Sequence, residues 1–267
     1  LILYIRYKYK FIKLRLSDLK ADKKTYMNQL KLSLPLGFQW SILFVGSFIQ
    51  SSQVNLYGGG LATKAAACYG SFESYLTIPF SVISQALLNF VGQNYGAKKL
   101  NRIKDGIIKC IYVELVCYIV VLIIAQTTKE LVPYIFLPDE DLADAINGPK
   151  IIYYTATYIG VMSPFLICQG ILQISRSSLQ GIKRPLIPFL SGVGELAARS
   201  FVCFILPSLV DPANPLSDKG YFALCFSTPL AWIFSVIIMG GSVLHIIYLN
   251  KNFADESADK VHSKYLE

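Results

Sequence analysis

Six long apolar stretches, separated by short polar or basic segments, dominate the pattern of this chain. The hydrocarbon core of a bilayer is about 30 Å thick, so a helix needs about 20 mostly apolar residues to cross it. Because lipid offers the backbone no hydrogen-bond partners, such stretches must be helical. The pattern therefore predicts an all-α, polytopic membrane protein built as a six-transmembrane-helix bundle. We place the helices at residues 29–56, 62–95, 106–131, 150–179, 186–207 and 219–248.

Glycine and proline mark where these helices are expected to end or bend. Gly58, Gly59 and Gly60 follow the first stretch and form a strong helix terminator. A proline inside a helix removes a backbone hydrogen bond and bends the helix. We therefore expect a bend at Pro79 in the second helix, acting either as a hinge or as a fixed kink. The fourth predicted helix contains Pro164.

The pattern divides the chain into three parts. Residues 29–249 form the predicted six-helix membrane lobe, and residues 250–267 form a predicted cytoplasmic tail. Residues 1–28 are apolar and then basic, which predicts the end of a preceding transmembrane helix followed by a basic cytoplasmic linker. A signal peptide carries its charges before its apolar residues, so this segment is not one. Since the chain begins with Leu1 rather than Met, we expect it to be the C-terminal part of a larger protein.

The composition and the charge pattern agree with a membrane protein. Hydrophobic residues make up 54% of the chain and charged residues 16%, whereas soluble domains carry about 25% charged residues. The net charge of +8 comes from basic blocks between alternate apolar stretches, so we expect no nucleic-acid partner. By the positive-inside rule, the first junction and the C-terminal tail face the cytoplasm. The basic blocks lie within residues 6–31, 98–109, 176–184 and 251–264.

Polar side chains follow one face of three of the predicted helices. At about 100° per residue, each set lies within about 100° of arc. Such faces predict the lining of a shared chamber for small molecules; the alternative is hydrogen bonding that only holds the bundle together. The rings, thioether and amides of the fourth helix are typical of surfaces that bind flat, amphipathic molecules. The predicted lining residues are Gln39, Gln50, Gln53, Glu73, Thr77, Tyr154, Tyr158, Met162, Gln169 and Gln173.

Glu73 is the candidate for ion coupling. A carboxylate inside the membrane is costly when it is ionised. We expect Glu73 to exchange a proton with water or to bind a cation directly; the alternative is a protonated or partnered side chain that fixes helix packing. Glu114 lies near the basic end of the third predicted helix, where we expect it to reach the membrane interface.

Two arginines and a further glutamate are assigned structural or gating roles, together with Pro79 and Pro164. Glu195 and Arg199 are four residues apart, which places them on one helix face, and we predict a structural ion pair. Arg176 ends the fourth helix and is predicted either to anchor that end or to pair with acidic groups at a gate.

The residues that catalysis or metal binding needs do not form a recognisable pattern. His245 and His262 are the two histidines, and the six cysteines form no CxxC motif, so we interpret the cysteines as small apolar side chains. The sequence also lacks a phosphate-binding P-loop and a nucleophile elbow. We therefore expect no enzyme activity, no cofactor and no metal site, with an H⁺ or Na⁺ gradient as the energy source.

Several motifs occur in an order that resembles one transporter family. Over residues 29–248 the chain is similar to the C-terminal half of a multidrug and toxic compound extrusion (MATE) transporter of the bacterial branch. The segment 85–97, which ends the second helix, is the most specific match. The other matching positions are 34–37, 49–55, 163–165, Arg176, 179–181, Glu195, Arg199 and 229–232.

The resemblance implies a lobe of six helices that pairs with an N-terminal six-helix lobe around a central chamber. Full members alternate between outward and inward states and export organic cations or drugs in exchange for sodium or protons. The implied partners of this chain are the lipid bilayer, small organic cations or drugs and the N-terminal lobe. The implied location is the inner membrane of a bacterium, and we expect no transport by this half unless it pairs with another half.

The chain also departs from the family, and two other functions stay open. Some members carry a carboxylate near the position of Gln39, and others carry one in the fourth helix, where this chain has none between Ile151 and Ser175. Coupling then depends on Glu73 or on the N-terminal lobe. The alternatives are a flippase for lipid-linked saccharides, against which the scarcity of basic residues on the polar faces argues, and a non-transporting membrane scaffold subunit.

Overall fold

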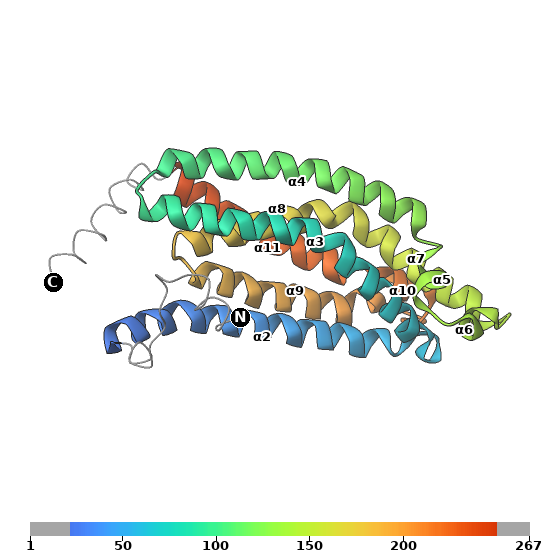
Figure 1. The fold of residues 1–267 in the computed structure, drawn as a ribbon. Helices are drawn as coiled ribbons and strands as arrows, with labels where there is room; N and C mark the ends of the chain where they lie inside the picture. Colours follow the sequence, from blue (N-terminus) through green and yellow to red (C-terminus); the bar gives the residue numbers. More distant parts are fainter. Residues whose placement is uncertain (1–21, 250–267) are drawn as a thin grey trace.

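The computed structural model describes residues 22–249, a bundle of helices joined by short connections (Figure 1). The first 21 residues of the predicted linker segment and the predicted tail, 250–267, lie outside the described residues. The α-helices are α2 (Lys23–Val54), α3 (Leu61–Gly96), α4 (Leu100–Thr128), α5 (Val132–Phe136), α6 (Asp139–Ala143), α7 (Asn147–Met162), α8 (Leu166–Gly181), α9 (Leu186–Val210), α10 (Asp218–Leu224) and α11 (Ser227–Val243). Shorter helical turns are η2 (Tyr57–Gly60), η3 (Ser163–Phe165) and the π-helical η4 (Leu244–Leu249).

The six predicted transmembrane segments are confirmed as long apolar helices. The first and third start earlier than expected, at Lys23 rather than residue 29 and at Leu100 rather than residue 106. The apolar pattern marks the part of a helix inside the hydrocarbon, whereas Lys and Arg extend the same helix into the polar layer because their helix propensity is high. The observed spans are Lys23–Val54, Tyr57–Gly96, Leu100–Thr128, Asn147–Gly181, Leu186–Val210 and Asp218–Tyr248.

Proline has different effects in different spans. Pro164 lies in η3, which separates α7 from α8, so the α-helix is interrupted there rather than only bent. In the sixth span, α10 ends at Leu224 and α11 begins at Ser227, with Pro229 in the first turn of α11. The missing N–H of a proline is harmless in a first turn, because that donor has no intrahelical partner. Pro79 lies inside the uninterrupted α3.

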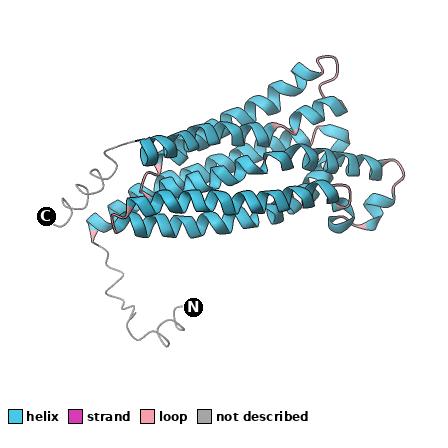
Figure 2. Ribbon diagram, turned by 90° about the horizontal axis from the view of Figure 1, so that it is seen from above, coloured by secondary structure: helices cyan, strands magenta, loops and turns pink. Residues whose placement is uncertain are grey.

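The helices lie side by side in an elongated bundle (Figures 1 and 2). α9 packs between α2 and α11, and α8 contacts α3, α4 and α11. α2 is held mainly by α9 and makes few contacts with α3. α4 lies on the outside of the bundle, and its apolar side chains Tyr112, Val116 and Ile123 are exposed, as expected for a helix in contact with lipid.

The two ends of the bundle differ in chemistry. The start of α2, the α3–α4 connection and the α8–α9 connection lie at one end (Figure 1), and these are three of the basic segments. The last two connections are tight, and each contains a lysine in the left-handed region, Lys98 with φ 56° and Lys183 with φ 60°. The described parts of three of the four predicted basic blocks therefore lie at one end of the bundle, and the fourth, at 251–264, lies outside the described residues.

The opposite end carries an acidic loop. Lys64 of α3 forms an ion pair with Asp141 of α6. The backbone N–H groups of Ile146 and Asn147 donate to Asp144 at 2.9 and 3.2 Å, and these hydrogen bonds hold the pKa of Asp144 below its ordinary value. The loop between α6 and α7 is thus fixed by local polar contacts.

A glycine allows α8 to lie close to α3 near the basic end. A Cβ added to Gly181 would lie 2.6 Å from Cγ1 and 2.8 Å from Cβ of Val91. Valine is branched at Cβ and has little rotamer freedom in a helix, so it cannot turn away. Gly92, the next residue on α3, faces open space, because a Cβ there meets nothing within 4 Å.

We predict that Gly181→Ala destabilises the lobe by about 1–3 kcal/mol, because the added methyl group overpacks the contact with Val91. Gly92→Ala is the matched control and should be neutral or stabilising by up to about 1 kcal/mol, since alanine favours a helix over glycine. Thermal unfolding of the purified chain in detergent measures both. Equal melting temperatures for the two variants would contradict the close packing of α8 on α3.

Candidate functional site

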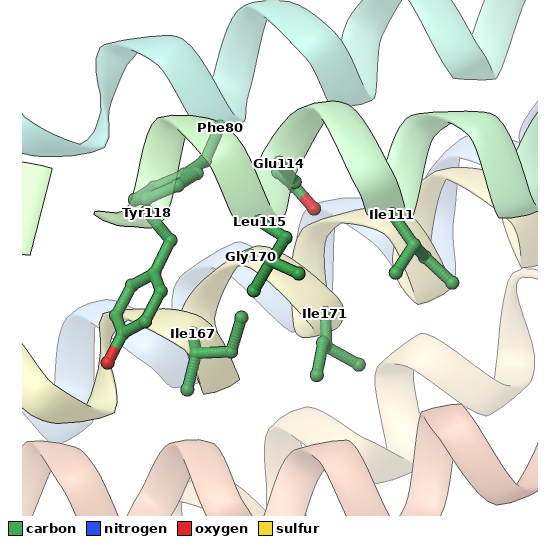
Figure 3. Close-up of a pocket in the computed structure, with 8 residues that line it drawn as sticks. All are labelled: Phe80, Ile111, Glu114, Leu115, Tyr118, Ile167, Gly170 and Ile171. Carbon is green, nitrogen blue, oxygen red and sulfur yellow. The ribbon is translucent and has the colours of Figure 1, made fainter. Parts of the chain in front are cut away.

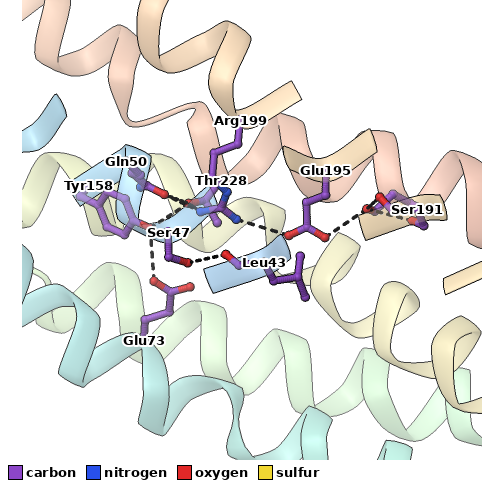
Figure 4. A network of polar contacts seen from close by, with 10 residues as sticks. Leu43, Ser47, Gln50, Glu73, Tyr158, Ser191, Glu195, Arg199 and Thr228 are labelled. Carbon is purple, nitrogen blue, oxygen red and sulfur yellow. Dashed lines mark hydrogen bonds and ion pairs between the residues drawn. The ribbon is translucent and has the colours of Figure 1, made fainter. Parts of the chain in front are cut away.

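A chain of hydrogen bonds links polar side chains of five helices inside the bundle (Figure 4). We call it the interhelical network. It connects α3 to α9 by way of α7, α11 and α2, so it crosses the bundle from one side to the other. Its members, in order, are Glu73 (α3), Tyr158 (α7), Thr228 (α11), Gln50 (α2), Arg199 and Glu195 (α9), Ser235 (α11) and Ser191 (α9).

Arg199 is the centre of the interhelical network. Its Nη1 donates to Oε1 of Gln50 and, at 3.3 Å, to Oγ1 of Thr228, while Nη2 donates to Oε1 of Glu195 at 3.3 Å. Only 8% of Arg199 is exposed. Gly46 of α2 provides the room, because a Cβ there would lie 3.3 Å from Cδ of Arg199. This one guanidinium therefore joins α2, α9 and α11.

Glu195 uses both of its carboxylate oxygens. Oε1 accepts from Arg199, and Oε2 accepts from the hydroxyl of Ser235 at 3.2 Å. The hydroxyl of Ser235 is in turn 3.0 Å from the hydroxyl of Ser191. Glu195, Ser235 and Ser191 are all buried. The four-residue spacing of Glu195 and Arg199 thus brings the two side chains into an ion pair within α9, and the second oxygen of Glu195 links this pair to Ser235 of α11.

Glu73 is the other end of the interhelical network. Its Oε2 accepts a hydrogen bond from the hydroxyl of Tyr158 at 3.2 Å, and this hydroxyl lies 3.3 Å from Oγ1 of Thr228. The ring of Tyr158 stacks on Tyr69 with 3.7 Å between centroids, which fixes the position of the hydroxyl. Glu73 is half-buried, whereas the other members are buried. It is therefore the member that solvent or a ligand reaches most easily.

Seven of the ten predicted lining residues lie outside the interhelical network. Gln39 is buried and packs on Gly192 of α9, and neither of its amide atoms has a hydrogen-bond partner in the part of the chain that the structure describes. Gln53 and Thr77 are half-buried, and the hydroxyl of Thr77 donates to the backbone carbonyl of Glu73 at 3.0 Å. Tyr154 is buried, with its ring 4.4 Å from that of Tyr221 between centroids.

The remaining residues of the fourth span have different environments. Met162 is fully buried in the hydrophobic core, so in this lobe it packs rather than faces a surface. Gln169 and Gln173 are half-buried. Arg176 donates to Oε1 of Gln173 at 3.3 Å and lies 5.7 Å from the ring centroid of Trp40 on α2. The contact with Gln173 stays within α8, whereas the contact with Trp40 joins the C-terminal part of α8 to the middle of α2.

The position of Glu114 differs from the expectation that this side chain reaches the membrane interface. It lies in the middle of α4 and is 3% exposed, so it does not reach the membrane interface. Because α4 begins at Leu100, Glu114 lies about four turns inside the helix. Its side chain points between α3 and α8 instead of toward the basic end.

Sequence reasoning missed Thr228, Ser235 and Ser191. Hydroxyl side chains in membrane helices usually bond to their own backbone, as Ser71 and Thr127 do here. No local sequence pattern distinguishes hydroxyl residues that bond to their own helix from Thr228, Ser235 and Ser191, which bond to other helices. All six cysteines are free, and each is buried or half-buried, as expected for small apolar side chains.

The MatE family model matches residues 35–205, from α2 into α9. The chain belongs to the MatE family. Members of this family are transporters and not enzymes, which agrees with the absence of a catalytic pattern in the sequence. The matched residues include Gln50, Glu73, Tyr158, Glu195 and Arg199 of the interhelical network.

Solved transporter structures share the fold. A MOP superfamily transporter from Pyrococcus furiosus has a TM-score of 0.74 and 14% identity over 91% of this chain and 53% of that chain. An outward-facing multidrug resistance MATE family transporter has a TM-score of 0.74 and 13% identity, over 93% of this chain and 53% of that chain. An inward-facing one has a TM-score of 0.67 and 12% identity, over 93% of this chain and 56% of that chain. The chain thus spans about half the length of these structures. No curated protein matches its sequence.

We predict that Arg199→Met destabilises this MatE chain by about 3 kcal/mol, because it leaves Glu195 as a buried carboxylate without its ion-pair partner. The double variant Arg199→Met/Glu195→Gln should recover about 1 kcal/mol or more, since a neutral amide is less costly to bury. Denaturant unfolding in detergent gives both values. If the double variant is less stable than the single one, the ion pair is not what holds Arg199 in place.

Proposed function

We propose that this chain is the C-terminal half of an antiporter that exports organic cations or drugs in exchange for H⁺ or Na⁺. The observation that carries the proposal is the charge balance of the interhelical network, which contains two carboxyl groups and one guanidinium. Arg199 balances Glu195 through a direct ion pair. The carboxylate of Glu73 accepts its hydrogen bond from the neutral hydroxyl of Tyr158. Among the described residues, no basic side chain forms an ion pair with this carboxylate.

An unbalanced carboxylate at membrane depth favours the uptake of one positive charge. The cost of burying the ionised form falls when a proton, a sodium ion or an organic cation neutralises it. One carboxyl group accepts one such charge at a time, so the coupling ion and a cationic substrate compete for it. Competition for one site is the simplest physical basis for exchange, and the half-burial of Glu73 supports access from a chamber.

The interhelical network also supports movement of the lobe as a unit. It ties five helices together through side chains that have few other partners, and α2 is joined to the rest mainly through α9. The similarity of this fold to outward- and inward-facing MATE transporters supports alternating access by tilting of the whole lobe against an N-terminal lobe.

We propose that the basic end of the bundle, with the C-terminus, faces the cytoplasm, and that the membrane is the inner membrane of a bacterium. A fluorescent protein fused to the C-terminus should then fluoresce, whereas alkaline phosphatase fused there should be inactive, because each folds on one side of that membrane only. Active phosphatase together with dark fluorescent protein would reverse this orientation.

We predict that Glu73→Gln abolishes coupled export while leaving the protein in the membrane, because glutamine keeps the shape but cannot take up a positive charge. The measurement is ethidium accumulation in efflux-deficient cells that express this chain with an N-terminal six-helix lobe. Accumulation with Glu73→Gln should rise to the level of cells without the transporter. Glu130→Gln is the matched control, since Glu130 is an exposed glutamate in a connection, and should export normally.

Three other outcomes have clear meanings. Normal export by Glu73→Gln would show that Glu73 takes no part in ion coupling. Export by this chain alone would show that two such halves suffice. If the unsubstituted chain exports nothing with an N-terminal lobe, although the protein is verified in the membrane, the antiporter proposal fails and a flippase or scaffold subunit takes its place.

A further inference from the structure

The carboxyl group of Glu114 is buried on α4 without a partner. The residue is 3% exposed, and within the described residues neither Oε1 nor Oε2 has a hydrogen-bond partner. It belongs neither to the interhelical network nor to the predicted polar faces. Buried carboxyl groups are normally hydrogen-bonded or paired with a cation, because an unsatisfied buried polar group is costly. Glu114 is therefore the strongest unexplained polar group in the part of the chain that the structure describes.

A pocket of about 230 Å³ lies against Glu114 where α3, α4 and α8 meet (Figure 3). Its other walls are apolar or aromatic. On the α4 side, Ile111 and Leu115 are 41% and 42% exposed, and they lie on the outer helix of the bundle. The pocket is therefore bordered on this side by lipid-facing side chains. Its lining residues besides Glu114 are Phe80, Ile111, Leu115, Tyr118, Ile167, Gly170 and Ile171.

Three features fix the walls of this pocket. Gly170 of α8 makes room for the carboxyl group, because a Cβ there would lie 3.3 Å from both Cδ and Oε2 of Glu114. The hydroxyl of Tyr118 donates to the carbonyl of Pro164 at 2.9 Å, which holds its ring in place and engages its polar end elsewhere. Phe80 is fully buried and cannot swing away. Glu114 is thus the sole ionisable carboxyl group among these lining residues.

We propose that this pocket binds a small hydrophobic ammonium ion that enters from the lipid side. A cavity of about 150 Å³ lined by Leu, Ile and Phe accommodates benzene, so about 230 Å³ has room for one ring and a short aminomethyl group. The ring packs on Phe80 and Tyr118, and the ammonium group donates to the free oxygens of Glu114. In a low-dielectric pocket such a charge-assisted hydrogen bond is stronger than one between neutral groups.

The protons balance in this binding step. When the carboxyl group of Glu114 is protonated and the amine arrives neutral through the lipid, the proton passes from the carboxyl oxygen to the amine nitrogen. When the ligand arrives as the ammonium ion, Glu114 releases its proton to water. Both routes end in the same ammonium–carboxylate pair.

The site is separate from Glu73 in the fold. Glu73 contacts α7 through Tyr158, while Glu114 lies on α4 against α8. The proposal therefore does not rest on the proposed antiport, and the two can fail independently.

The test is ligand binding to the full chain in nanodiscs of zwitterionic lipid, followed by ¹⁹F NMR. The probe is 4-fluorobenzylammonium, and 4-fluorobenzyl alcohol is its neutral counterpart of the same size. Glu114→Gln should weaken binding of the ammonium probe by about tenfold or more, which corresponds to about 1.4 kcal/mol, and should leave binding of the alcohol unchanged. Since the carboxyl group of Glu114 has no hydrogen-bond partner among residues 22–249 that the substitution could break, this variant should fold.

Two further variants separate this pocket from other sites. Leu115→Trp should fill the mouth of the pocket and weaken binding of both probes, without removing the carboxyl group. Glu73→Gln should bind both probes like the unsubstituted chain. The proposal is overturned if Glu114→Gln binds the ammonium probe as tightly as the unsubstituted chain does. It is also overturned if Glu73→Gln, rather than Glu114→Gln, weakens binding of the ammonium probe. The third contrary outcome is that the unsubstituted chain binds the ammonium probe without saturation or no more tightly than it binds the alcohol.

Discussion

Polar side chains inside a membrane must find their hydrogen-bond partners within the protein, and the guanidinium of Arg199 meets this requirement by bonding to several helices at once. It bonds to three side chains from α2, α9 and α11, and all of these groups are buried. Lipid gives helices little hydrophobic reason to associate, since its tails are as apolar as the helix surfaces. Close packing and hydrogen bonds of this kind therefore decide which helices are neighbours, and Gly46 gives Arg199 the space to reach them.

The polar groups of the lobe fall into two kinds. Those of the interhelical network largely satisfy one another, which makes that part of the lobe stiff. Gln39, Gln169 and Glu114 instead keep buried polar atoms without a hydrogen-bond partner among residues 22–249. The first two lie on the faces predicted to line a chamber, and the third lies beside an apolar pocket on a different side. The satisfied groups hold the helices together, whereas the unsatisfied ones keep their hydrogen-bonding capacity.

The interruptions of the helices occur beside these groups. The 3₁₀ turn at Pro164 interrupts the fourth span, and its carbonyl accepts the hydrogen bond from Tyr118. The sixth span is interrupted between Leu224 and Ser227, next to Thr228 of the interhelical network. Interrupted backbone inside a membrane is tolerated where other groups of the protein satisfy it. Both interruptions therefore lie at or beside residues that bond to neighbouring helices.

Features that a single helix encodes could be predicted from the sequence. Length and apolar content identified the six spans, and spacing placed Glu195 and Arg199 on one face. What depends on how helices turn toward each other could not be predicted. Gln50 meets Thr228 across 178 residues and Tyr158 meets Glu73 across 85, so no local pattern contains these contacts. The burial of Glu114 and of Met162 likewise follows from which helices surround them. The sequence by itself determined which groups must lie in the membrane, because hydrophobicity acts residue by residue, whereas the tertiary structure decided which polar groups are paired, because pairing depends on distances between helices.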